Sequence, residues 1–311
     1  MEMHQLRYFV AVARSGNFSR AADECHVAQP SLSQQILKLE DEVGERLFER
    51  TRRRAILTPA GTLFLPHALN ILEAAERGRQ EIREMGGQVR GKIVLGALPT
   101  IAPYFLPEII RLFREKYPGA ELILYEQTTD QLLRNLEENE IDLAIISDAP
   151  TNPNIQVEQL FSEELLLCLP VDHTLVHQKS VVAADLRQEK FILMHDSHCL
   201  GAQAQEFCQS KGFKPRISCH SAQVGTVLAM VKAGLGISLI PEMAREHGRE
   251  EGIAYRSLNG VRPKRAIVVA VSNQRKPSRG TIELSKFIRE NGTVGMSSRS
   301  SGTVRDGQAD G

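Results

Sequence analysis

Gln29-Pro30-Ser31-Leu32-Ser33-Gln34-Gln35-Ile36-Leu37-Lys38-Leu39 is the stretch that decides the fold of the first part of this chain. Proline is well tolerated at the first helical position, because the N–H that it lacks would have no partner there. Apolar side chains then recur at helical spacing and predict one buried face: Leu32, Ile36, Leu39 and Val43. The opposite face carries Ser31, Gln34 and Lys38. Short polar side chains and one lysine suit the base edges and phosphates of a DNA major groove.

The segments on either side extend this pattern. Residues 4–15 and a second short run containing Ala21 and Ala22 predict two small helices before the first stretch. After it, a basic turn between two short extended pieces describes a wing laid against phosphates: Arg50, Arg52, Arg53 and Arg54. Small amphipathic helices and surface arginines are each common, but in this order they favour a winged helix-turn-helix over residues 1–58.

A long helix is predicted over residues 59–88, with Thr58 as its cap. Apolar positions recur at alternating spacings of three and four, interrupted by one arginine: Leu65, Ala68, Leu72, Ala75, Arg79 and Ile82. Such a seam is typical of a coiled coil, although a helix packed on its own domain would also explain it. We favour a linker helix that dimerises, because the segments before and after it are predicted to form separate domains. Pro66 should bend the helix.

From residue 89 the pattern changes to alternating strands and helices, which predicts parallel sheets covered by helices. Two such series predict two subdomains around a cleft, residues 89–161 with 267–292, and residues 162–266. Thr100 and Thr129 follow the first two strands, so both hydroxyls should face the crevice at the carboxyl ends of the strands. A turn residue and a helix N-cap are the alternative interpretations.

Two cysteines, Cys199 and Cys208, lie at the ends of a predicted helix preceded by Asp196-Ser197. At the helix N-terminus the dipole favours a thiolate at Cys199, and His198 could add to this effect. The two thiols would be roughly 13 Å apart along the axis. A disulfide needs Cα atoms within about 7 Å, so closing it would unfold the segment. The alternative is a pair of ordinary buried cysteines.

Composition narrows the remaining choices. The formal net charge of this 311-residue chain is +0, so DNA binding must depend on a local site. No apolar run reaches the roughly 20 residues that span a membrane. Residues 1–5 lack the basic-then-apolar pattern of a secretion signal, so we expect the protein in the cytoplasm. The spacing of histidines and cysteines around residues 195–220 matches no zinc pattern, so we expect neither metal nor cofactor. Residues 293–311 are rich in Gly, Ser and charge, and predict a disordered tail.

Residues 1–61 resemble the DNA-binding domain of LysR-type transcriptional regulators. The resemblance rests on an ordered series of short motifs: Leu6-Arg7-Tyr8-Phe9, Phe18-Ser19-Arg20-Ala21-Ala22, Gln29 to Ile36, Leu39-Glu40, Gly44, Leu47-Phe48-Glu49-Arg50 and Leu57-Thr58-Pro59-Ala60-Gly61. It implies that Ser31, Ser33, Gln34 and Lys38 contact DNA with the wing arginines. It also implies a dimer of dimers on a promoter, with RNA polymerase as a further partner.

The second part resembles the periplasmic-binding-protein-like regulatory domain of that family, and more narrowly its peroxide-sensing branch. The matching stretches are Leu98 to Tyr104, Asp196 to Leu200, Phe207-Cys208, Ala233 to Ile237 and Ile240-Pro241. The resemblance implies that Cys199 is attacked by peroxide and that Cys208 resolves it. It assigns peroxide contacts to Thr100 and Thr129, and a hydrogen bond near Cys199 to His198. One departure is Gly201, where the best-known members carry an arginine.

The sequence therefore predicts an α+β multidomain regulator: a winged helix-turn-helix, a linker helix and an α/β regulatory domain of two subdomains. It would sense hydrogen peroxide through a reversible Cys199–Cys208 disulfide and be reset by thioredoxin- or glutaredoxin-type reductants. A first alternative is a regulator that binds a small effector in the same cleft. A second is a thiol peroxidase, which would leave the N-terminal domain unexplained.

Overall fold

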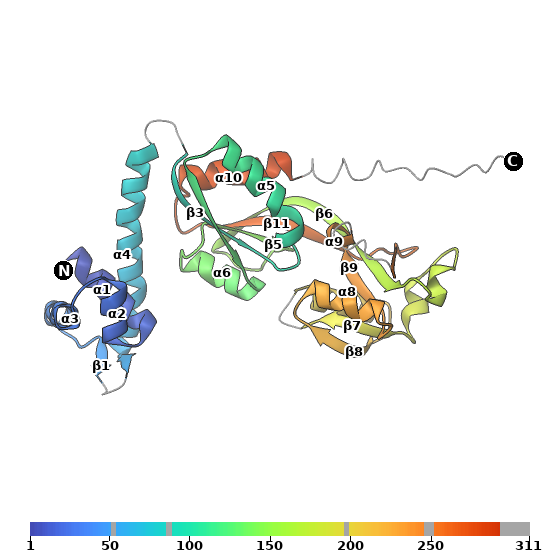
Figure 1. The fold of residues 1–311 in the computed structure, drawn as a ribbon, viewed down its shortest axis with the longest axis horizontal. Helices are drawn as coiled ribbons and strands as arrows, with labels where there is room; N and C mark the ends of the chain where they lie inside the picture. The colour runs from blue at the N-terminus through green and yellow to red at the C-terminus, as the bar shows by residue number, and fades with distance from the viewer. Residues whose placement is uncertain (51–53, 85–88, 196–198, 246–251, 293–311) are drawn as a thin grey trace. The chain divides into compact units, whose positions relative to one another are not determined.

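The computed structural model describes residues 1–50, 54–84, 89–195, 199–245 and 252–292. The chain forms two compact units, Met1–Gly87 and Gln88–Gly311 (Figure 1). The predicted tail over residues 293–311 lies outside the described residues. None of the described helices is both long and apolar enough to cross a membrane.

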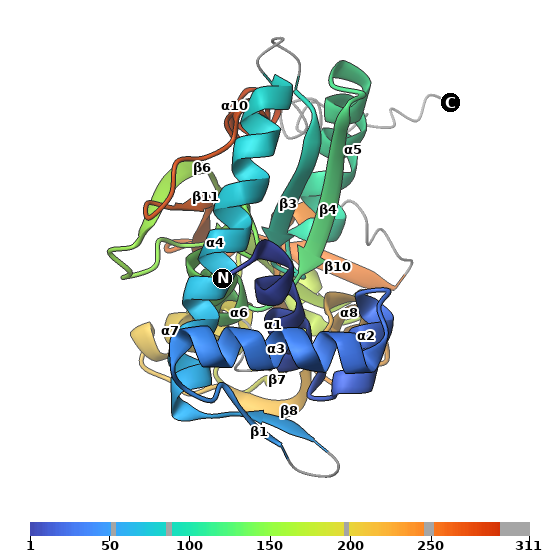
Figure 2. The ribbon, with the colours of Figure 1, turned by 90° about the vertical axis from the view of Figure 1, so that its left-hand side faces the viewer.

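Unit 1 has the predicted order of a winged helix-turn-helix followed by a long helix. Its elements are α1 (Met3–Ser15), α2 (Phe18–Glu24), α3 (Gln29–Val43), β1 (Phe48–Arg50), β2 (Ala55–Leu57) and α4 (Pro59–Glu84). Strands β1 and β2 pair antiparallel as a hairpin. Figure 2 shows α3 crossing the front of this unit, with the hairpin below it. The core lies between α1, α2, α3 and the first turns of α4.

The buried face of α3 differs from the prediction at its last turn. Leu32, Ile36 and Leu39 are fully buried, but Val43 is 38% exposed and Glu40 is buried instead. The carboxylate of Glu40 accepts hydrogen bonds from the backbone N–H groups of Leu47 (2.9 Å) and Phe48 (3.1 Å). This acidic side chain thereby joins the end of α3 to the first strand of the wing. A pattern based on apolar residues could not anticipate it.

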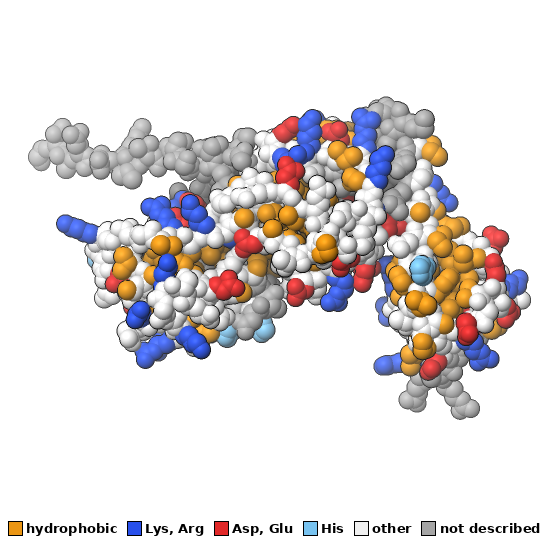
Figure 3. All heavy atoms as spheres, turned by 180° about the vertical axis from the view of Figure 1, so that it is seen from behind, with side chains coloured by type: hydrophobic (Ala, Val, Ile, Leu, Met, Phe, Trp, Pro, Cys, Tyr) orange, Lys and Arg blue, Asp and Glu red, His pale blue; other side chains and the backbone are white. Residues whose placement is uncertain are grey.

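The linker helix α4 packs partly against its own unit and leaves other apolar side chains exposed, and its dimerising role stays a prediction. It continues through Pro66 without interruption, and Ala68 is buried against its own unit. By contrast, Leu63 and Ile82 are 71% and 70% exposed. Figure 3 shows hydrophobic side chains gathered on one face of this unit.

Unit 2 is built on one seven-stranded sheet and one two-stranded sheet. The first subdomain contains β3 (Gly91–Ala97), α5 (Ala102–Lys116), β4 (Ala120–Glu126), α6 (Thr129–Glu137), β5 (Leu143–Ser147), β11 (Lys264–Ser272) and α10 (Arg279–Asn291). Helices α5 and α10 cover one face of its sheet and α6 covers the other (Figure 1).

The second subdomain contains β7 (Lys190–Met194), α7 (Cys199–Ser210), β8 (Arg216–Ser221), α8 (Val224–Lys232), β9 (Ser238–Pro241), α9 (Glu242–Arg245) and β10 (Ile253–Arg256). Two short 3₁₀ turns, Thr174–Val176 and Ala183–Leu186, precede β7.

Strand β6 (Ile155–Pro170) belongs to both subdomains. Its first part pairs with β11, and from Leu165 onwards it pairs with β9 and β10. All of these pairings are antiparallel, whereas β3–β4, β3–β5 and β7–β8 are parallel. The prediction of parallel sheets was therefore wrong for β6, β9, β10 and β11. The chain crosses between the subdomains on β6 and β11 themselves, and these strands run in opposite directions.

Candidate functional site

The polar face of α3 is open to solvent. Ser31, Gln34 and Lys38 are exposed, and Ser33 is half-buried and accepts a hydrogen bond from Gln29 Nε2 at 2.9 Å. Their spacing of three and four residues places Ser31, Gln34 and Lys38 on one side of the helix. This face offers the polar groups that a major-groove helix needs.

Of the four predicted wing arginines, Arg54 is exposed. Arg50 ends β1, and its side chain lies outside the described part of the structure. Arg52 and Arg53 lie outside the described residues altogether. The wing hairpin itself is present on both sides of this gap.

Cys199 lies where the two subdomains meet. It is the first described residue of α7, and its side chain packs against the core of the first subdomain. The next apolar residues of α7, Leu200, Ala204 and Phe207, pack into the core of the second subdomain, and so does Cys208. Both cysteines are free thiols. Cys208 comes nine positions after Cys199, about 13 Å further along the helix axis, so α7 must unwind before the two thiols can bond.

Thr129 and Arg265 both act on the Cys199 thiol, and Thr100 is hydrogen-bonded to Arg265. The Thr129 hydroxyl, at the first residue of α6, is buried and has no nitrogen or oxygen partner among the described residues. It faces the Cys199 sulfur closely enough to lower the pKa of the thiol. Thr100 is fully buried, and its Oγ1 accepts a hydrogen bond of 2.8 Å from Nη1 of Arg265. Both predicted threonines therefore lie in this region, and His198 lies outside the described residues.

Arg265 is the residue that sequence reasoning missed. Its guanidinium is completely buried and pairs with Glu163 (Nη2 to Oε1, 2.7 Å), which is buried as well. It also donates from Nη2 to the backbone oxygen of Thr100 at 3.0 Å. Glu163 in turn accepts from the backbone N–H of Met243. Arg265 and Glu163 face each other across β11 and β6, so a buried ion pair lies on the two strands that join the subdomains.

The surroundings of Cys199 do not favour the thiolate that its position at a helix N-terminus predicts. Burial raises the pKa of the Cys199 thiol above its ordinary value of 9.0, and Asp148 raises it further. Arg265 and Thr129 oppose this by lowering the pKa, but burial has the larger effect. Cys208 is also buried, which raises the pKa of its thiol to about 11. With α7 in place, both sulfurs are protonated at neutral pH.

The burial of the Cys199 thiol predicts how its rate of alkylation depends on pH. In the reduced, folded protein, the rate of alkylation of Cys199 by iodoacetamide should keep rising above pH 9.0, because the pKa is raised by burial. In the urea-unfolded chain, the midpoint should fall to about 8.5, the value of a solvated thiol. Mass spectrometry of the Cys199 peptide after timed alkylation measures both profiles. Equal midpoints would contradict the buried position of the sulfur.

Gly201 permits a close approach of α7 to the end of β7. A Cβ atom at this position would lie 2.4 Å from the backbone oxygen of Met194 and 3.2 Å from that of His195. A larger side chain would therefore displace the first turn of α7. The cation that the resemblance led us to expect at position 201 is absent, and Arg265 supplies a cation from β11 instead.

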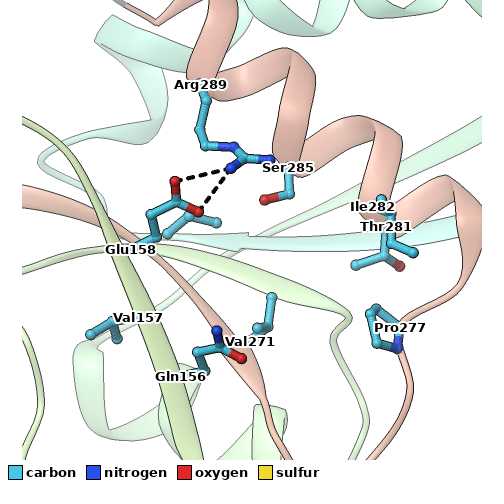
Figure 4. A pocket seen from close by; sticks show the side chains of 10 residues that line it. Gln156, Val157, Glu158, Val271, Pro277, Thr281, Ile282, Ser285 and Arg289 are labelled. Carbon is cyan, nitrogen blue, oxygen red and sulfur yellow. Dashed lines mark hydrogen bonds and ion pairs between the residues drawn. The ribbon is translucent and has the colours of Figure 1, made fainter.

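Other candidate sites are weaker. Among the described residues, no group of three or more His, Cys, Asp or Glu side chains is placed to hold a metal ion. A pocket of about 180 Å³ lies between α10 and strands β6 and β11 (Figure 4). It is lined by valines, and Arg289 is paired with Glu158 on its wall at 3.0 Å. Glu158 is five strand residues from Glu163, about 17 Å along β6, so this pocket is separate from the Cys199 region.

Two family models together cover nearly all of the chain. The bacterial regulatory helix-turn-helix protein model of the lysR family matches residues 3–62, and the LysR substrate-binding domain model matches residues 86–293. The chain belongs to the LysR family. It is thus a regulator built from a DNA-binding and a substrate-binding domain.

Within the LysR family, the chain is 36% identical over 292 residues to the hydrogen peroxide-inducible genes activator of Pectobacterium carotovorum subsp. carotovorum. The match covers 93% of this chain and 96% of that protein. Among solved structures, full-length OxyR from Pseudomonas aeruginosa, in a variant form, is 28% identical with a TM-score of 0.75, covering 94% of this chain and 95% of that one. The LysR-family regulator CbnR in complex with its target DNA is 28% identical with a TM-score of 0.69, covering 93% and 99%.

Proposed function

We propose that this LysR-family regulator binds promoter DNA and senses hydrogen peroxide through a reversible disulfide between Cys199 and Cys208. The observation that carries the proposal is the position of Cys199. Its thiol begins a helix of one subdomain, packs on the core of the other, and lies beside Thr129 and Arg265. A change at this sulfur therefore acts on the contact between the subdomains. The relative from P. carotovorum is named as an activator of hydrogen peroxide-inducible genes, which supports the choice of oxidant.

The chemistry proceeds in two balanced steps. The Cys199 thiol releases its proton, its thiolate attacks one oxygen of hydrogen peroxide, and the O–O bond breaks. Cys199 becomes a sulfenic acid, and the leaving hydroxide takes up the proton to give water. The Cys208 thiolate then attacks the Cys199 sulfur, the S–O bond breaks, and the leaving hydroxide takes up a proton to give water. Peroxide is reduced and the two sulfurs are oxidised by two electrons.

Individual residues have distinct roles in this proposal. The Thr129 hydroxyl faces the Cys199 sulfur, has no nitrogen or oxygen partner among the described residues, and would hydrogen-bond peroxide. Thr100, held by Arg265, would contact peroxide from the same region. His198 is proposed to contact Cys199 from the preceding segment. The guanidinium of Arg265 stabilises the thiolate once peroxide or water enters. Because burial raises the pKa of the Cys199 thiol, the thiolate is a minor species while α7 is helical.

The output is proposed to reach DNA through the oligomer. Closing the disulfide unwinds α7 and repacks the second subdomain, which alters how subunits of a dimer of dimers meet. The paired α3 helices, with Ser31, Ser33, Gln34, Lys38 and the arginines of the wing, then bind the promoter with a different spacing. RNA polymerase and a thioredoxin- or glutaredoxin-type reductant are proposed partners, which would place the protein in the cytoplasm.

A disulfide map tests the proposal. After exposure of the full-length protein to a low concentration of hydrogen peroxide, non-reducing peptide mapping should find Cys199 crosslinked to Cys208. The crosslink should disappear on treatment with a thiol reductant. A protein that stays fully reduced, and that is stabilised by a metabolite instead, would contradict peroxide sensing and favour a small-molecule effector in the cleft.

A further inference from the structure

We propose that Gln203 is a positioning residue that holds α7 in its reduced place on the first subdomain, and thereby sets the redox potential of the Cys199–Cys208 pair. This inference rests on the proposed function, since it concerns the same disulfide. Gln203 lies between the two cysteines, four residues after Cys199, and so points from the same side of α7 as the thiol.

The contact joins α7 to the end of β5. Gln203 Nε2 donates hydrogen bonds to Ser147 Oγ at 2.8 Å and to Asp148 Oδ2 at 2.5 Å. Ser147 is the last residue of β5 and is buried. We refer to these two hydrogen bonds as the Gln203 contact. They run from a helix of the second subdomain to a strand of the first.

The acceptor side of the contact is itself held in place. Asp148 has a left-handed backbone conformation, with φ of 58°, which a non-glycine residue adopts uncommonly. Its second carboxylate oxygen, Oδ1, accepts a hydrogen bond of 3.0 Å from the backbone N–H of Ala266. Ala266 directly follows Arg265 on β11. The Gln203 contact therefore meets the same crossing strand that carries the buried ion pair.

The contact cannot persist when the disulfide forms. Bringing the two cysteines from about 13 Å to bonding distance takes residues 200–207 off their helical path. Gln203 is in the middle of this segment, and Gly201 removes the side chain that would otherwise resist a change of backbone conformation. The contact thus exists in the reduced form alone. Any free energy that it contributes favours the dithiol over the disulfide.

The contact is also only moderately strong. Gln203 Oε1 is buried and has no hydrogen-bond partner among the described residues. An unpaired buried carbonyl oxygen offsets part of the benefit of the two donated hydrogen bonds. A contact of intermediate strength suits a helix that must be held and also released. Without it, the reduced form loses stability relative to the oxidised form.

The experiment measures the redox potential of the full-length protein with Gln203→Leu, in dithiothreitol or glutathione buffers of defined potential. Mass spectrometry after alkylation gives the crosslinked fraction at each potential. The equilibrium constant for reduction should fall about tenfold, which moves the potential about 30 mV more negative. Gln209→Leu is the matched control, because Gln209 is exposed on the same helix. It should change the constant less than about twofold, the effect of a solvent-exposed substitution.

A second variant approaches the contact from the other side. Ser147→Ala removes one acceptor and should shift the potential in the same direction as Gln203→Leu. In the double variant the shift should be clearly less than the sum of the two, because both changes remove one shared hydrogen bond. Unchanged potentials in both single variants, or shifts that add fully, would overturn the role of Gln203. If the wild-type protein forms no crosslink in any buffer, the proposed function fails and this inference falls with it.

Discussion

Replacing Arg265 by methionine is expected to lower the free energy of unfolding of unit 2 by about 3–5 kcal/mol. The substitution removes the cation that neutralises Glu163, whose side chain is completely buried. It also removes the donors to the hydroxyl and backbone oxygen of Thr100. A carboxylate left alone in a buried place is far more costly than the loss of a surface ion pair.

Urea unfolding followed by far-ultraviolet circular dichroism measures this loss. Arg289→Met is the matched control, since Arg289 pairs with Glu158 at 3.0 Å and the two side chains are 43% and 52% exposed. Its effect should stay below about 1 kcal/mol. Combining Arg265→Met with Glu163→Leu should recover part of the lost stability, because the unpaired charge is then gone. Equal effects of Arg265→Met and Arg289→Met would show that the buried pair contributes little.

Cys199→Ser is expected to abolish the peroxide-dependent change in the DNA footprint while leaving the footprint of the reduced protein in place. Serine is close to cysteine in size and keeps a hydrogen-bonding group next to Thr129, but its hydroxyl is not oxidised by peroxide. The side chain is far in sequence from the residues proposed to contact DNA and lies in a different compact unit. The loss of response should therefore be complete and selective.

Footprinting of promoter DNA with and without peroxide measures both parts of this prediction. Cys219→Ser is the control, because Cys219 is a half-buried free thiol outside α7. It should respond as the wild type does. If Cys199→Ser loses all DNA binding, Cys199 has a structural role, and the redox interpretation is contradicted.

The sequence predicted those features that depend on local spacing. The three apolar residues of α3 follow from helical periodicity. The wing hairpin follows from a basic turn between two short extended pieces, and the helix that carries both cysteines follows from the cap residues before it. Thr129 was found because the ends of parallel strands meet at one edge of a sheet. At the end of α3, Val43 was predicted to be buried, but Glu40 is buried instead. The carboxylate of Glu40 accepts hydrogen bonds from two later N–H groups, and a pattern of apolar residues cannot predict such bonds.

Features that depend on distant partners were missed. Arg265 is 102 positions from Glu163 and 165 from Thr100, so nothing near it in the sequence announces either contact. The available signal was an arginine at the start of an apolar strand, next to Ala266-Ile267-Val268. A single arginine at a strand end usually faces solvent, but here it is buried because Glu163, Thr100 and Met243 all contact its guanidinium. Gln203 escaped notice for the same reason, since its partners are 55 and 56 positions away.

The long strand β6 also determines how the regulatory unit can be divided. The chain enters the second subdomain near Glu164 and leaves it at Lys264, and these two residues are partners in the β6–β11 ladder. One peptide-bond cleavage inside the second subdomain therefore leaves each fragment anchored to the first, one through β6 and the other through β11. Releasing that subdomain takes two cuts, both within paired backbone. Cleavage of one peptide bond in a surface loop of the second subdomain would cut the chain in two, but the two fragments would stay associated.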